Sequence, residues 1–441
     1  MPGEGQPPFF RADELNCAGE KVAAVGVSLV SKRVVVIGGG VIGTACAYYL
    51  NKSGWDVTII EQSTIGSGAS HANCGLVCPS HILPLAGPGV MGKTIKAMFS
   101  PNSPFSIKPR FDPSLWSWML KFAGRCNQQD MLTAGRAIQA LLNASRQLYD
   151  ELFATESLDV EWQTRGLLFP FLTRRAMDHY SHTDDLLGEQ FGMRAVRYDG
   201  DAVCQLEPAL KSGLAGGWHY PGDAHLRPDK LMSSWRTLLQ SRGVVIQEHS
   251  EFRGFASLNQ RVTRAITSTG EVEGDQFLVA TGAWTPLLNQ QLGCKLLIQP
   301  GKGYSLTMAR PAKCPAIPLI FEEHRVAVTP MESGYRLGSI MEFAGYDSTI
   351  NPRRVEMLRT GAAHYLQEPT AEPVTEQWAG WRPMTPGSLP IIDRTPTFEN
   401  VMIAAGHNML GLSMATGTGQ LVADLLAQQP PRIDPKPFAM P

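Results

Sequence analysis

The sequence predicts an α/β fold with two domains, one built around a parallel sheet and the other around a mixed sheet. The β-branched run Val34–Ile37 is typical of a buried parallel strand, and it ends in a G-x-G-x-x-G motif formed by Gly38, Gly40 and Gly43. A helical stretch follows, and then a second apolar strand, Val57–Ile60. This β-α-β order indicates a Rossmann-like domain. Strand patterns spread over the rest of the chain indicate a second sheet.

The three glycines and the start of the helix predict a dinucleotide site. Gly38 permits a tight turn, and Gly40 lets the backbone approach a pyrophosphate. Gly43 lets the helix lie close to the strand. The helix begins near Val41 and Ile42, where its N–H groups and positive dipole end would face the phosphates. A glycine-rich turn without a ligand is the alternative reading of the motif alone.

The second strand ends in an acid that fits the ribose of such a ligand. Glu61 lies within the reach of about 20 residues at which a carboxylate accepts hydrogen bonds from an adenosine ribose, and we include Gln62 beside it in the expected site. The negative charge of Glu61 argues against a 2′-phosphate, and therefore against NADP.

A loop of small residues follows at 63–79. Ser70 and Asn73 are expected donors, and Gly75 is one of several small residues that would let the backbone wrap a large flat ligand. Ordinary loop composition is the alternative.

Composition excludes several classes of function. With 43% apolar and 18% charged residues over 441 positions, the chain is globular and long enough for two domains. Its net charge of −1 gives no bias towards nucleic acid. The eight cysteines are scattered, and Cys74 and Cys78 have no second pair nearby, so we expect no metal site and reduced thiols in the cytoplasm. No apolar stretch approaches the roughly 20 residues of a membrane span.

Two stretches leave alternatives open. Residues 80–125 are Pro-rich and then aromatic, with Trp116, Trp118 and Phe122 among the aromatic residues. They suit a lid, a surface that touches a membrane, or core, and core is the commonest fate of aromatic side chains. Residues 1–32 contain one short apolar run. We favour a disordered extension over a signal peptide there, because a clear cleavage site is lacking.

The other elements are predicted from the periodicity of apolar residues and from the turn-forming residues between them. The predicted helices are Ala134–Thr155, Asp229–Gln240, Arg353–Leu366 and 412–428. The main further strands are Trp162–Phe171, Leu214–Tyr220, Val262–Ser268, Phe277–Ala280, Leu297–Met308, Val326–Pro330, Tyr335–Ser339 and Val401–Ala405.

Two further turns extend the predicted site. A strand runs into a small-residue turn at Thr281 and Gly282, and another into Gly406-His407. The last helix, which begins near Gly411 and Leu412, would point a second helix N-terminus into the same crevice. A long insertion follows the first β-α-β unit, and the C-terminal part of the chain completes the sheet. This arrangement suits FAD, whose ring needs an anchoring point far from the pyrophosphate.

Three segments beyond the glycine motif carry a family resemblance. They are Gly301–Thr307 (GKGYSLT), Trp378–Pro386 (WAGWRPMTP) and Gly406–Ser413 (GHNMLGLS) with its continuation Gly417–Leu421. With them the chain resembles, over 33–428, the FAD-dependent amine and amino-acid oxidoreductases of the D-amino-acid oxidase type. The greatest likeness is to bacterial D-amino-acid dehydrogenases. Cys74 stands where a small apolar residue is expected.

The resemblance implies a D-amino-acid oxidase-like fold, with a Rossmann-like FAD-binding domain and a mixed-sheet substrate-binding domain. The segments implied for the FAD-binding domain are 33–80, 227–295 and 391–430. Those implied for the substrate-binding domain are 81–226, with the helix 134–155 packing on the FAD-binding domain, and 296–390. The extension 1–32 and a tail at 431–441 complete the chain.

The resemblance also implies roles for individual residues. Arg382 would hold the substrate carboxylate, and a guanidinium suits this role as an always-charged, bidentate donor. Lys302 and Tyr304 would border the ring or the substrate. Tyr335 and Arg336 lie on a neighbouring strand, where alternation lets only one of them face the site. For His407, contact with the flavin and a structural hydrogen bond are both open.

The implied activity is oxidative deamination of D-amino acids to 2-oxo acids and ammonia, with hydride passing from Cα to flavin N5. One alternative is a secondary-amine enzyme for D-proline, 4-hydroxy-D-proline, sarcosine or glycine, and another is a non-catalytic flavin-binding subunit. A quinone or respiratory-chain acceptor is the expected electron partner. A cytoplasmic location with peripheral contact at the inner face of the membrane would fit that partner.

Overall fold

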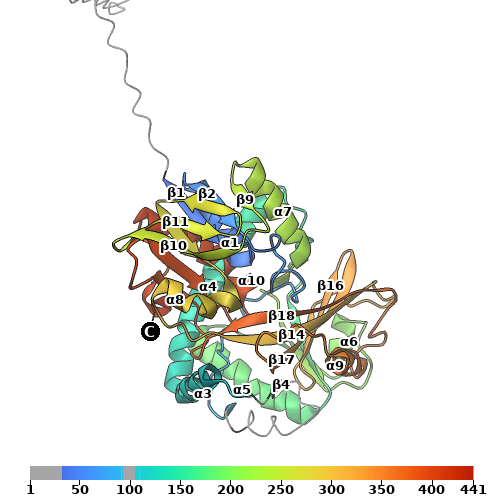
Figure 1. The fold of residues 1–441 in the computed structure, drawn as a ribbon. Coiled ribbons are helices and arrows are strands. Elements are labelled where there is room, and N and C mark those ends of the chain that lie inside the picture. Colours follow the sequence, from blue (N-terminus) through green and yellow to red (C-terminus); the bar gives the residue numbers. More distant parts are fainter. Residues whose placement is uncertain (1–31, 91, 93–104, 109, 441) are drawn as a thin grey trace, which may run out of the picture. The chain divides into compact units, whose positions relative to one another are not determined.

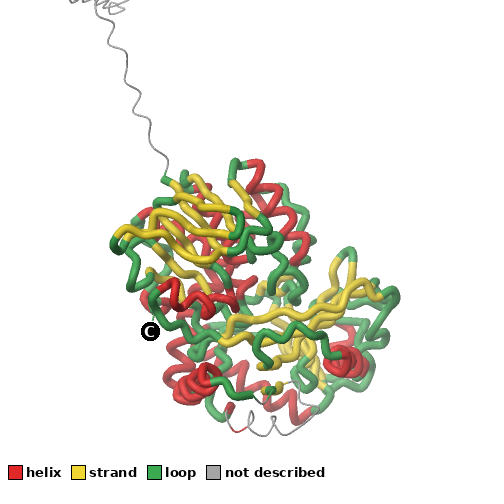
Figure 2. Tube along the Cα trace, in the orientation of Figure 1, coloured by secondary structure: helices red, strands yellow, loops and turns green. Residues whose placement is uncertain are grey.

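The computed structural model describes residues 32–90, 92, 105–108 and 110–440. Lys32–Pro441 form one compact unit, shown as a ribbon in Figure 1. The expected extension at 1–32 lies, except for Lys32, outside the described residues. Figure 2 shows that the strands gather in two groups, with helices packed around each.

The first group is a mostly parallel sheet with the order β19-β20-β13-β1-β2-β9. In that order the strands are Ile391–Arg394, Val401–Ala405, Gln276–Val279, Arg33–Ile37, Asp56–Ile60 and Val245–Gln247. All neighbours pair in parallel except β19 and β20. The chain therefore supplies this sheet from stretches far apart in sequence, with the glycine-motif strand β1 near its centre.

Alternation along β1 gives the sheet two buried faces. Val34 and Val36 pack against helices on one side, whereas Val35 and Ile37 face the three-stranded antiparallel sheet on the other. That small sheet consists of β10 (Phe252–Leu258), β11 (Arg261–Thr267) and β12 (Gly270–Glu273).

On the face of the parallel sheet that carries Val34 and Val36, three helices form a layer: α1 (Val41–Lys52), α10 (Gly411–Ala427) and α4 (Gln128–Thr155). Helix α10 contacts both of the others, and small residues make this close approach fit. A Cβ on Gly419 would lie 2.7 Å from the carbonyl oxygen of Ala45 in α1. On the α4 side, the hydroxyls of Ser145 and Thr416 lie 2.8 Å apart and share a hydrogen bond.

The second group is a nine-stranded mixed sheet with the order β18-β14-β17-β16-β15-β5-β7-β6, to which β4 adds by pairing with β17. In that order, with β4 last, the strands are Val374–Met384, Gln299–Met308, Gly334–Phe343, Val326–Met331, Leu319–Phe321, Leu167–Phe171, Gly216–Tyr220, Val196–Asp199 and Phe105–Ile107. Two pairs, β5 with β15 and β4 with β17, are parallel and the others antiparallel. The predicted α/β fold with one parallel and one mixed sheet is confirmed.

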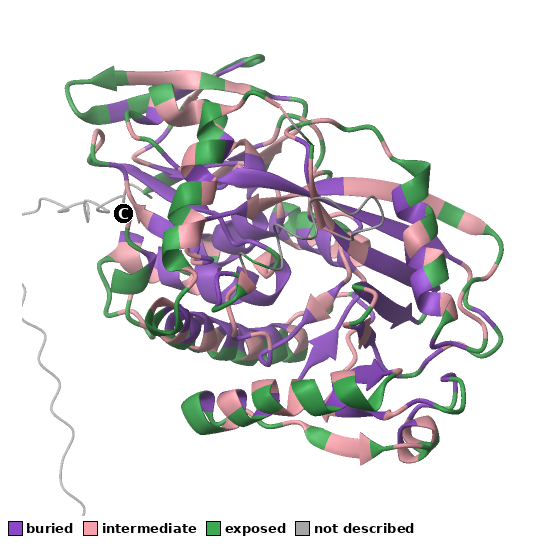
Figure 3. Ribbon diagram, turned by 90° about the horizontal axis from the view of Figure 1, so that it is seen from below, coloured by how far each residue is buried: buried purple, intermediate pink, exposed green. Residues whose placement is uncertain are grey.

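Helices cover the mixed sheet and leave their outer sides to solvent, as the burial colours of Figure 3 show. The main ones are α3 (Pro113–Arg125), α5 (Arg174–Phe191) and α9 (Pro352–Ala363). The remaining elements are β3 (Leu76–Val77), α6 (Ala202–Leu206), β8 (Ala224–His225), α7 (Pro228–Ser241), η1 (Gly282–Leu288), α8 (Asn289–Leu292) and η2 (Lys436–Phe438). Among the described helices, none combines the length and apolar character that crossing a membrane requires.

Candidate active site

A cavity of about 1500 Å³ extends from the glycine motif to the mixed sheet. Most residues predicted for the cofactor site lie in its wall. They are Gly38, Gly40, Val41, Ile42, Glu61, Gln62, Ser70, Asn73, Gly75, Thr281, Gly282, His407, Gly411 and Leu412. Gly43 and Gly406 lie behind this wall, where they shape turns and packing. The fold thus brings together residues from five separate stretches of the chain.

The glycine motif is built as its spacing predicts. Gly38 has a φ of +110°, and a Cβ there would lie 2.6 Å from the carbonyl oxygen of Ala280. A Cβ on Gly43 would lie only 1.9 Å from the carbonyl oxygen of Gly38. A side chain at either position would therefore push the first turn of α1 away from the sheet.

Backbone donors hold the Glu61 carboxylate at the edge of this cradle. Its Oε2 accepts a 2.7 Å hydrogen bond from the N–H of Gly39, and its Oε1 accepts one of 2.9 Å from the N–H of Ser63. Each carboxylate oxygen keeps a second lone pair for a ligand. The side chain of Ser70 reaches the start of α1, where its Oγ accepts a 2.8 Å hydrogen bond from the N–H of Val41.

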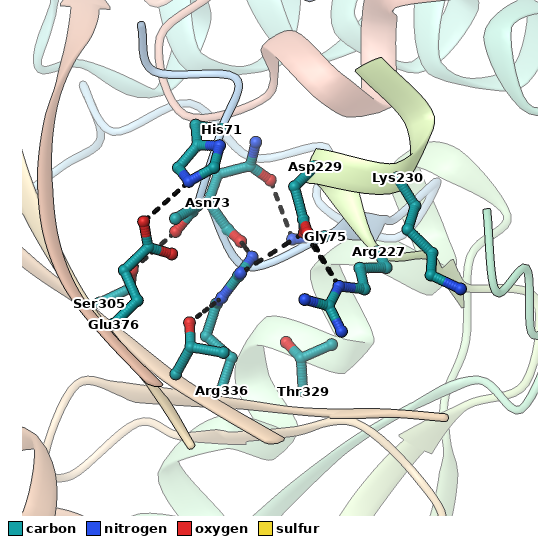
Figure 4. Close-up of polar contacts among 12 residues, drawn as sticks. His71, Asn73, Gly75, Arg227, Asp229, Lys230, Ser305, Thr329, Arg336 and Glu376 are labelled. Atoms are coloured by element: carbon teal, nitrogen blue, oxygen red, sulfur yellow. Dashed lines mark hydrogen bonds and ion pairs between the residues drawn. The ribbon is translucent and has the colours of Figure 1, made fainter. Parts of the chain in front are cut away.

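The loop at 63–79, which we call the cofactor loop, is bound to the mixed sheet. Three of its successive backbone carbonyls accept hydrogen bonds from that sheet, as Figure 4 shows in part. Ser305 Oγ donates to Ala72 (2.7 Å), Arg336 donates to Asn73 (2.8 Å) and Thr329 Oγ1 donates to Cys74 (2.5 Å), each at the carbonyl oxygen. These donors come from β14, β17 and β16. We call these three contacts the carbonyl clamp. It fixes the loop that carries Ser70, Asn73 and Gly75 to the second sheet.

Arg336 is the charged member of this clamp. Its guanidinium is buried, donates to Thr307 Oγ1 at 2.9 Å and lies 3.7 Å from Asp229 of α7. Tyr335 points to the other face of β17, where its hydroxyl donates to the carbonyl oxygen of Pro369 at 3.4 Å. Alternation therefore sends Arg336 towards the cofactor loop, although it binds the protein there and does not line the cavity.

Lys302 and Tyr304 share the face of β14 that points away from the clamp. Lys302 Nζ donates to the carbonyl oxygen of Thr349, and Tyr304 donates to Glu342 at 2.6 Å. Tyr304 borders the cavity, whereas Lys302 does not. Burial lowers the pKa of Lys302 and raises that of Tyr304. The structure thus separates these two residues from the group around Asn73.

Arg382 lines the cavity as a half-buried cation without a carboxylate partner among the described residues. Its guanidinium donates to two carbonyl oxygens, those of Ile340 at 2.8 Å and Ser339 at 3.4 Å. Both of these residues have positive φ, at +59° and +135°, where β17 departs from regular pairing with β14. Burial lowers the pKa of Arg382. A half-buried guanidinium in a cavity wall, with neutral partners only, is an arrangement that an anionic ligand completes.

Two residues near this cation were not predicted from the sequence. Gly303 lies on β14 against Arg382, and a Cβ there would lie 2.3 Å from its guanidinium. The Cys74 thiol packs on Gly338 and lies in the fields of Arg382 and Arg336, although burial still raises its pKa. The sequence signal for Gly303 was its place in the GKGYSLT segment. There two glycines alternate with larger residues, so the glycines share one face of the strand and the larger residues share the other.

The sequence left two roles open for His407, contact with the flavin and a structural hydrogen bond. The structure shows the hydrogen bond. The Nε2 atom of His407 lies 3.0 Å from Thr418 Oγ1 of α10, and burial lowers its pKa to about 3. The residue also borders the cavity, at the place where α10 begins with Gly411. A neutral imidazole therefore supports the N-terminal end of this helix.

The cavity has the chemistry that FAD requires. The glycine cradle and α1 suit the pyrophosphate, Glu61 suits the ribose, and the wall continues to α10 and Arg382 for the ring and a substrate. The volume also exceeds the range of roughly 300–1000 Å³ that small-ligand pockets occupy, as expected for two ligands together.

Comparison with known proteins agrees with this geometry. The D-amino acid dehydrogenase of Granulibacter bethesdensis is 31% identical over 412 residues, which cover 91% of this chain and 97% of that protein. The D-amino acid dehydrogenase of Methylobacterium nodulans is 33% identical over 413 residues and covers 91% and 96%. Glycine oxidase from Geobacillus kaustophilus has the same fold, with a TM-score of 0.75 at 23% identity over 93% of this chain and 99% of its own.

The L-proline dehydrogenase from P. horikoshii is similar in fold as well, with a TM-score of 0.68 and 20% identity over 93% of this chain and 96% of its own. The family model described as DAO, FAD dependent oxidoreductase, matches residues 33–425. This match confirms both the expected family and the expected cofactor. The chain therefore belongs to the DAO family of FAD-dependent oxidoreductases.

Proposed function

We propose that this protein is a D-amino-acid dehydrogenase, which oxidises D-amino acids to imino acids that water converts to 2-oxo acids and ammonia. The observation that carries the proposal is Arg382, a half-buried guanidinium without a carboxylate partner among the described residues, in the wall of the FAD cavity. It donates to two backbone carbonyls and contacts the Met341 sulfur, all of them neutral, so donors remain for a bidentate contact with a substrate carboxylate. The relatives named above support the same substrate class.

When bound, FAD supplies the acceptor for the hydride that leaves Cα. The protein's part is to hold and orient. Gly38 and Glu61 would fix the dinucleotide end, and the carbonyl clamp would keep the loop at Asn73 against the ring region. Arg382 would fix the substrate by its carboxylate. A protein base is unnecessary in this scheme if the amine binds in its neutral form.

The test is anaerobic mixing of the FAD-loaded enzyme with a panel of substrates, followed at the flavin absorbance. Rapid bleaching by D-amino acids, and none by their L-enantiomers, is the expected result. Faster bleaching by D-proline, 4-hydroxy-D-proline or sarcosine would make the protein a secondary-amine enzyme, and faster bleaching by glycine would make glycine its substrate. A flavin that dithionite reduces and no amine bleaches would make it a non-catalytic flavin-binding subunit.

We further propose that electrons pass to a quinone at a membrane surface. Helix α3 supports this proposal. On its inner side, Trp118 is 5% exposed and donates to the carbonyl oxygen of Met384 at 2.8 Å. On its outer side, Trp116 and Leu120 are 53% and 76% exposed, and Phe111 just before the helix is 94% exposed.

This placement corrects the expected membrane contact in one respect. Trp118 stacks on Phe122 at a centroid distance of 5.0 Å, as part of an apolar cluster that borders the cavity. The outer surface therefore consists of Trp116, Leu120 and Phe111 instead. Comparison of dye-coupled turnover under nitrogen with hydrogen peroxide formation in air tests the acceptor, because matching rates would indicate an oxidase.

A further inference from the structure

Three potential metal ligands meet in the cavity wall, in a place to which the proposed reaction assigns no role. Cys78, His81 and Asp223 each offer one ligand atom, and these atoms all lie within 4.8 Å of one another. Cys78 and His81 line the cavity. Asp223 comes from the turn just before β8, far away in sequence. Spacing along the chain could not show this group, since it contains only one cysteine and its acid is distant.

Asp223 is a buried carboxylate with no ion pair to any described residue. It is 1% exposed, and its oxygens accept hydrogen bonds from neutral donors: the Ser80 N–H at 3.1 Å, the Ser80 Oγ at 2.5 Å and the Cys78 thiol. Arg146 lies nearby, but its guanidinium binds the carbonyl oxygen of Gly222 and pairs with Asp150. A buried anion without a paired cation is costly, and a bound cation would remove that cost.

The other two ligand groups lie beside this carboxylate. The Cys78 side chain is buried, and its backbone N–H donates to Ser413 Oγ at 3.2 Å, which fixes the loop against α10. The Nδ1 atom of His81 is shielded from solvent and has no hydrogen-bond partner among the described residues. Buried imidazole nitrogens are normally satisfied, so this atom lacks a partner that a metal ion would provide.

We propose that Cys78, His81 and Asp223 form a site for one divalent transition-metal ion, for which Zn²⁺ is the best match. Thiolate sulfur, imidazole nitrogen and carboxylate oxygen are together the ligand set of zinc, whereas Mg²⁺ and Ca²⁺ take oxygen ligands. A thiolate and a carboxylate would neutralise the ion. Ser80 would orient the carboxylate from outside the ligand shell.

The site is of the open kind. Three protein ligands leave one tetrahedral position unfilled, and because Cys78 and His81 line the cavity, that position can be reached from it. The ion would bind reversibly and exchange through the cavity. The proposal concerns a separate site and is independent of the substrate.

Cobalt provides a direct test on the full-length, FAD-loaded protein, since Co²⁺ in a tetrahedral site with sulfur absorbs at longer wavelengths than flavin. Titration should give one equivalent of such a band, and Zn²⁺ should abolish it. Cys78→Ser and His81→Gln should each weaken binding at least tenfold, whereas Cys204→Ser, at a partly exposed cysteine outside the cavity, should leave it unchanged. Flavin content, measured in parallel, reports that each variant has folded.

A second measurement uses the unaltered protein. Zn²⁺ should slow alkylation of Cys78, read by peptide mass spectrometry, and leave the rate at Cys204 unchanged. Absence of a cobalt band and of zinc protection would overturn the proposal and leave the three residues as a hydrogen-bonded cluster. A cobalt band that survives both Cys78→Ser and His81→Gln would overturn it equally, because the ion would then lie elsewhere.

Discussion

Gly303 lies against the guanidinium of Arg382, so closely that a Cβ at Gly303 would come within 2.3 Å of it. The two residues lie diagonally on the paired strands β14 and β18, where the register partner of Arg382 is Gly301, near the carbonyls of Ser339 and Ile340 that hold the guanidinium. A glycine in this strand therefore makes room for the cation that we propose binds the substrate carboxylate.

Arg382→Ala should cripple oxidation of amino acids and leave FAD bound. Loss of a buried, charge-assisted contact should cost about 2–5 kcal/mol in kcat/KM, whereas an amine without a carboxylate should lose much less. Steady-state kinetics with both kinds of substrate measure the difference. Equal losses would mean that Arg382 supports structure.

Gly303→Ala tests the same contact without removing the charge. The new methyl group should displace the guanidinium and raise KM for amino acids, with the flavin retained. Gly387→Ala is the matched control, because a Cβ at Gly387 has no neighbour within 4 Å. An unchanged KM in Gly303→Ala would show that substrate binding does not depend on the position of the Arg382 guanidinium.

Glu61→Gln should weaken FAD binding by about 1–3 kcal/mol, because a charged acceptor facing the ribose becomes a neutral amide. Part of the loss would come from the N–H groups of Gly39 and Ser63, which the carboxylate now holds. Fluorescence titration of the apoprotein with FAD gives the dissociation constant. Glu273→Gln, which removes an exposed charge paired with Arg33, is the control. A dissociation constant that stays the same in Glu61→Gln would remove this residue from the ribose site.

Local signals made the first part of the site predictable from the sequence. The roles of Gly38 and Gly43 follow from a strand, a turn and a helix that are contiguous in the chain, and the structure builds them so. It was harder to predict towards which side of the sheet the side chains of Lys302 and Tyr304 point. It depends on which face of β14 meets the cofactor loop, and the register with β17 shifts between these two residues.

Long-range contacts account for most of what the sequence could not predict. The carbonyl clamp joins Asn73 to Arg336 over 263 positions, and no pattern along the chain marks such a pair. Helix α3 was not predicted because its segment was read as a Pro-rich, aromatic stretch, although its residues follow a helical period. Helix α5 was not predicted either, although its buried residues Met177, Asp184, Leu187 and Phe191 recur at helical spacing.

Arg336→Lys should loosen the carbonyl clamp. Lysine keeps the charge but cannot reach Thr307 and the carbonyl oxygen of Asn73 with a planar fork, so we expect a loss of about 1–3 kcal/mol in the free energy of unfolding. The flavin reduction potential should also shift, because the loop that carries Asn73 would move against the ring. Thr329→Val removes a neutral clamp contact and should have a smaller effect on both. If the free energy of unfolding changes and the flavin reduction potential does not, the carbonyl clamp has a structural role only.

His407 should make stability depend on pH. Burial lowers its pKa from 6.5 to about 3, so the unfolded chain binds a proton in this window that the folded protein does not. The stability associated with neutral His407 is therefore fully present above pH 6.5 and is lost as the pH falls towards 3, at up to about 1.4 kcal/mol per pH unit.

His407→Gln removes this titration and keeps a partner for Thr418. The gap in unfolding free energy between the unaltered protein and the variant should shrink by about 2 kcal/mol between pH 7 and pH 5. Denaturant unfolding of the FAD-loaded proteins measures it. The control is His179→Gln, the same substitution at an exposed site on α5. A gap that is constant with pH would mean that His407 titrates alike in both states.

The outer side of α3 should bind anionic vesicles. Trp116 and Leu120 lie one turn apart and exposed, and the exposed basic residue Lys121 follows Leu120 directly. Burial of two such apolar side chains at a membrane surface is worth roughly 1.5–3 kcal/mol each, so replacing both with serine should weaken vesicle binding at least tenfold. Sedimentation with vesicles at two salt concentrations measures the apolar and electrostatic parts.

The control for this surface is Leu258→Ser, which removes an apolar side chain that is 72% exposed on β10. It should leave vesicle binding unchanged. If the membrane contact delivers electrons, the double serine variant should also lose turnover with a quinone held in the vesicles and keep full turnover with a soluble dye. Equal turnover with both acceptors would show that α3 takes no part in electron transfer, because the quinone would then be reached without the surface formed by Trp116 and Leu120.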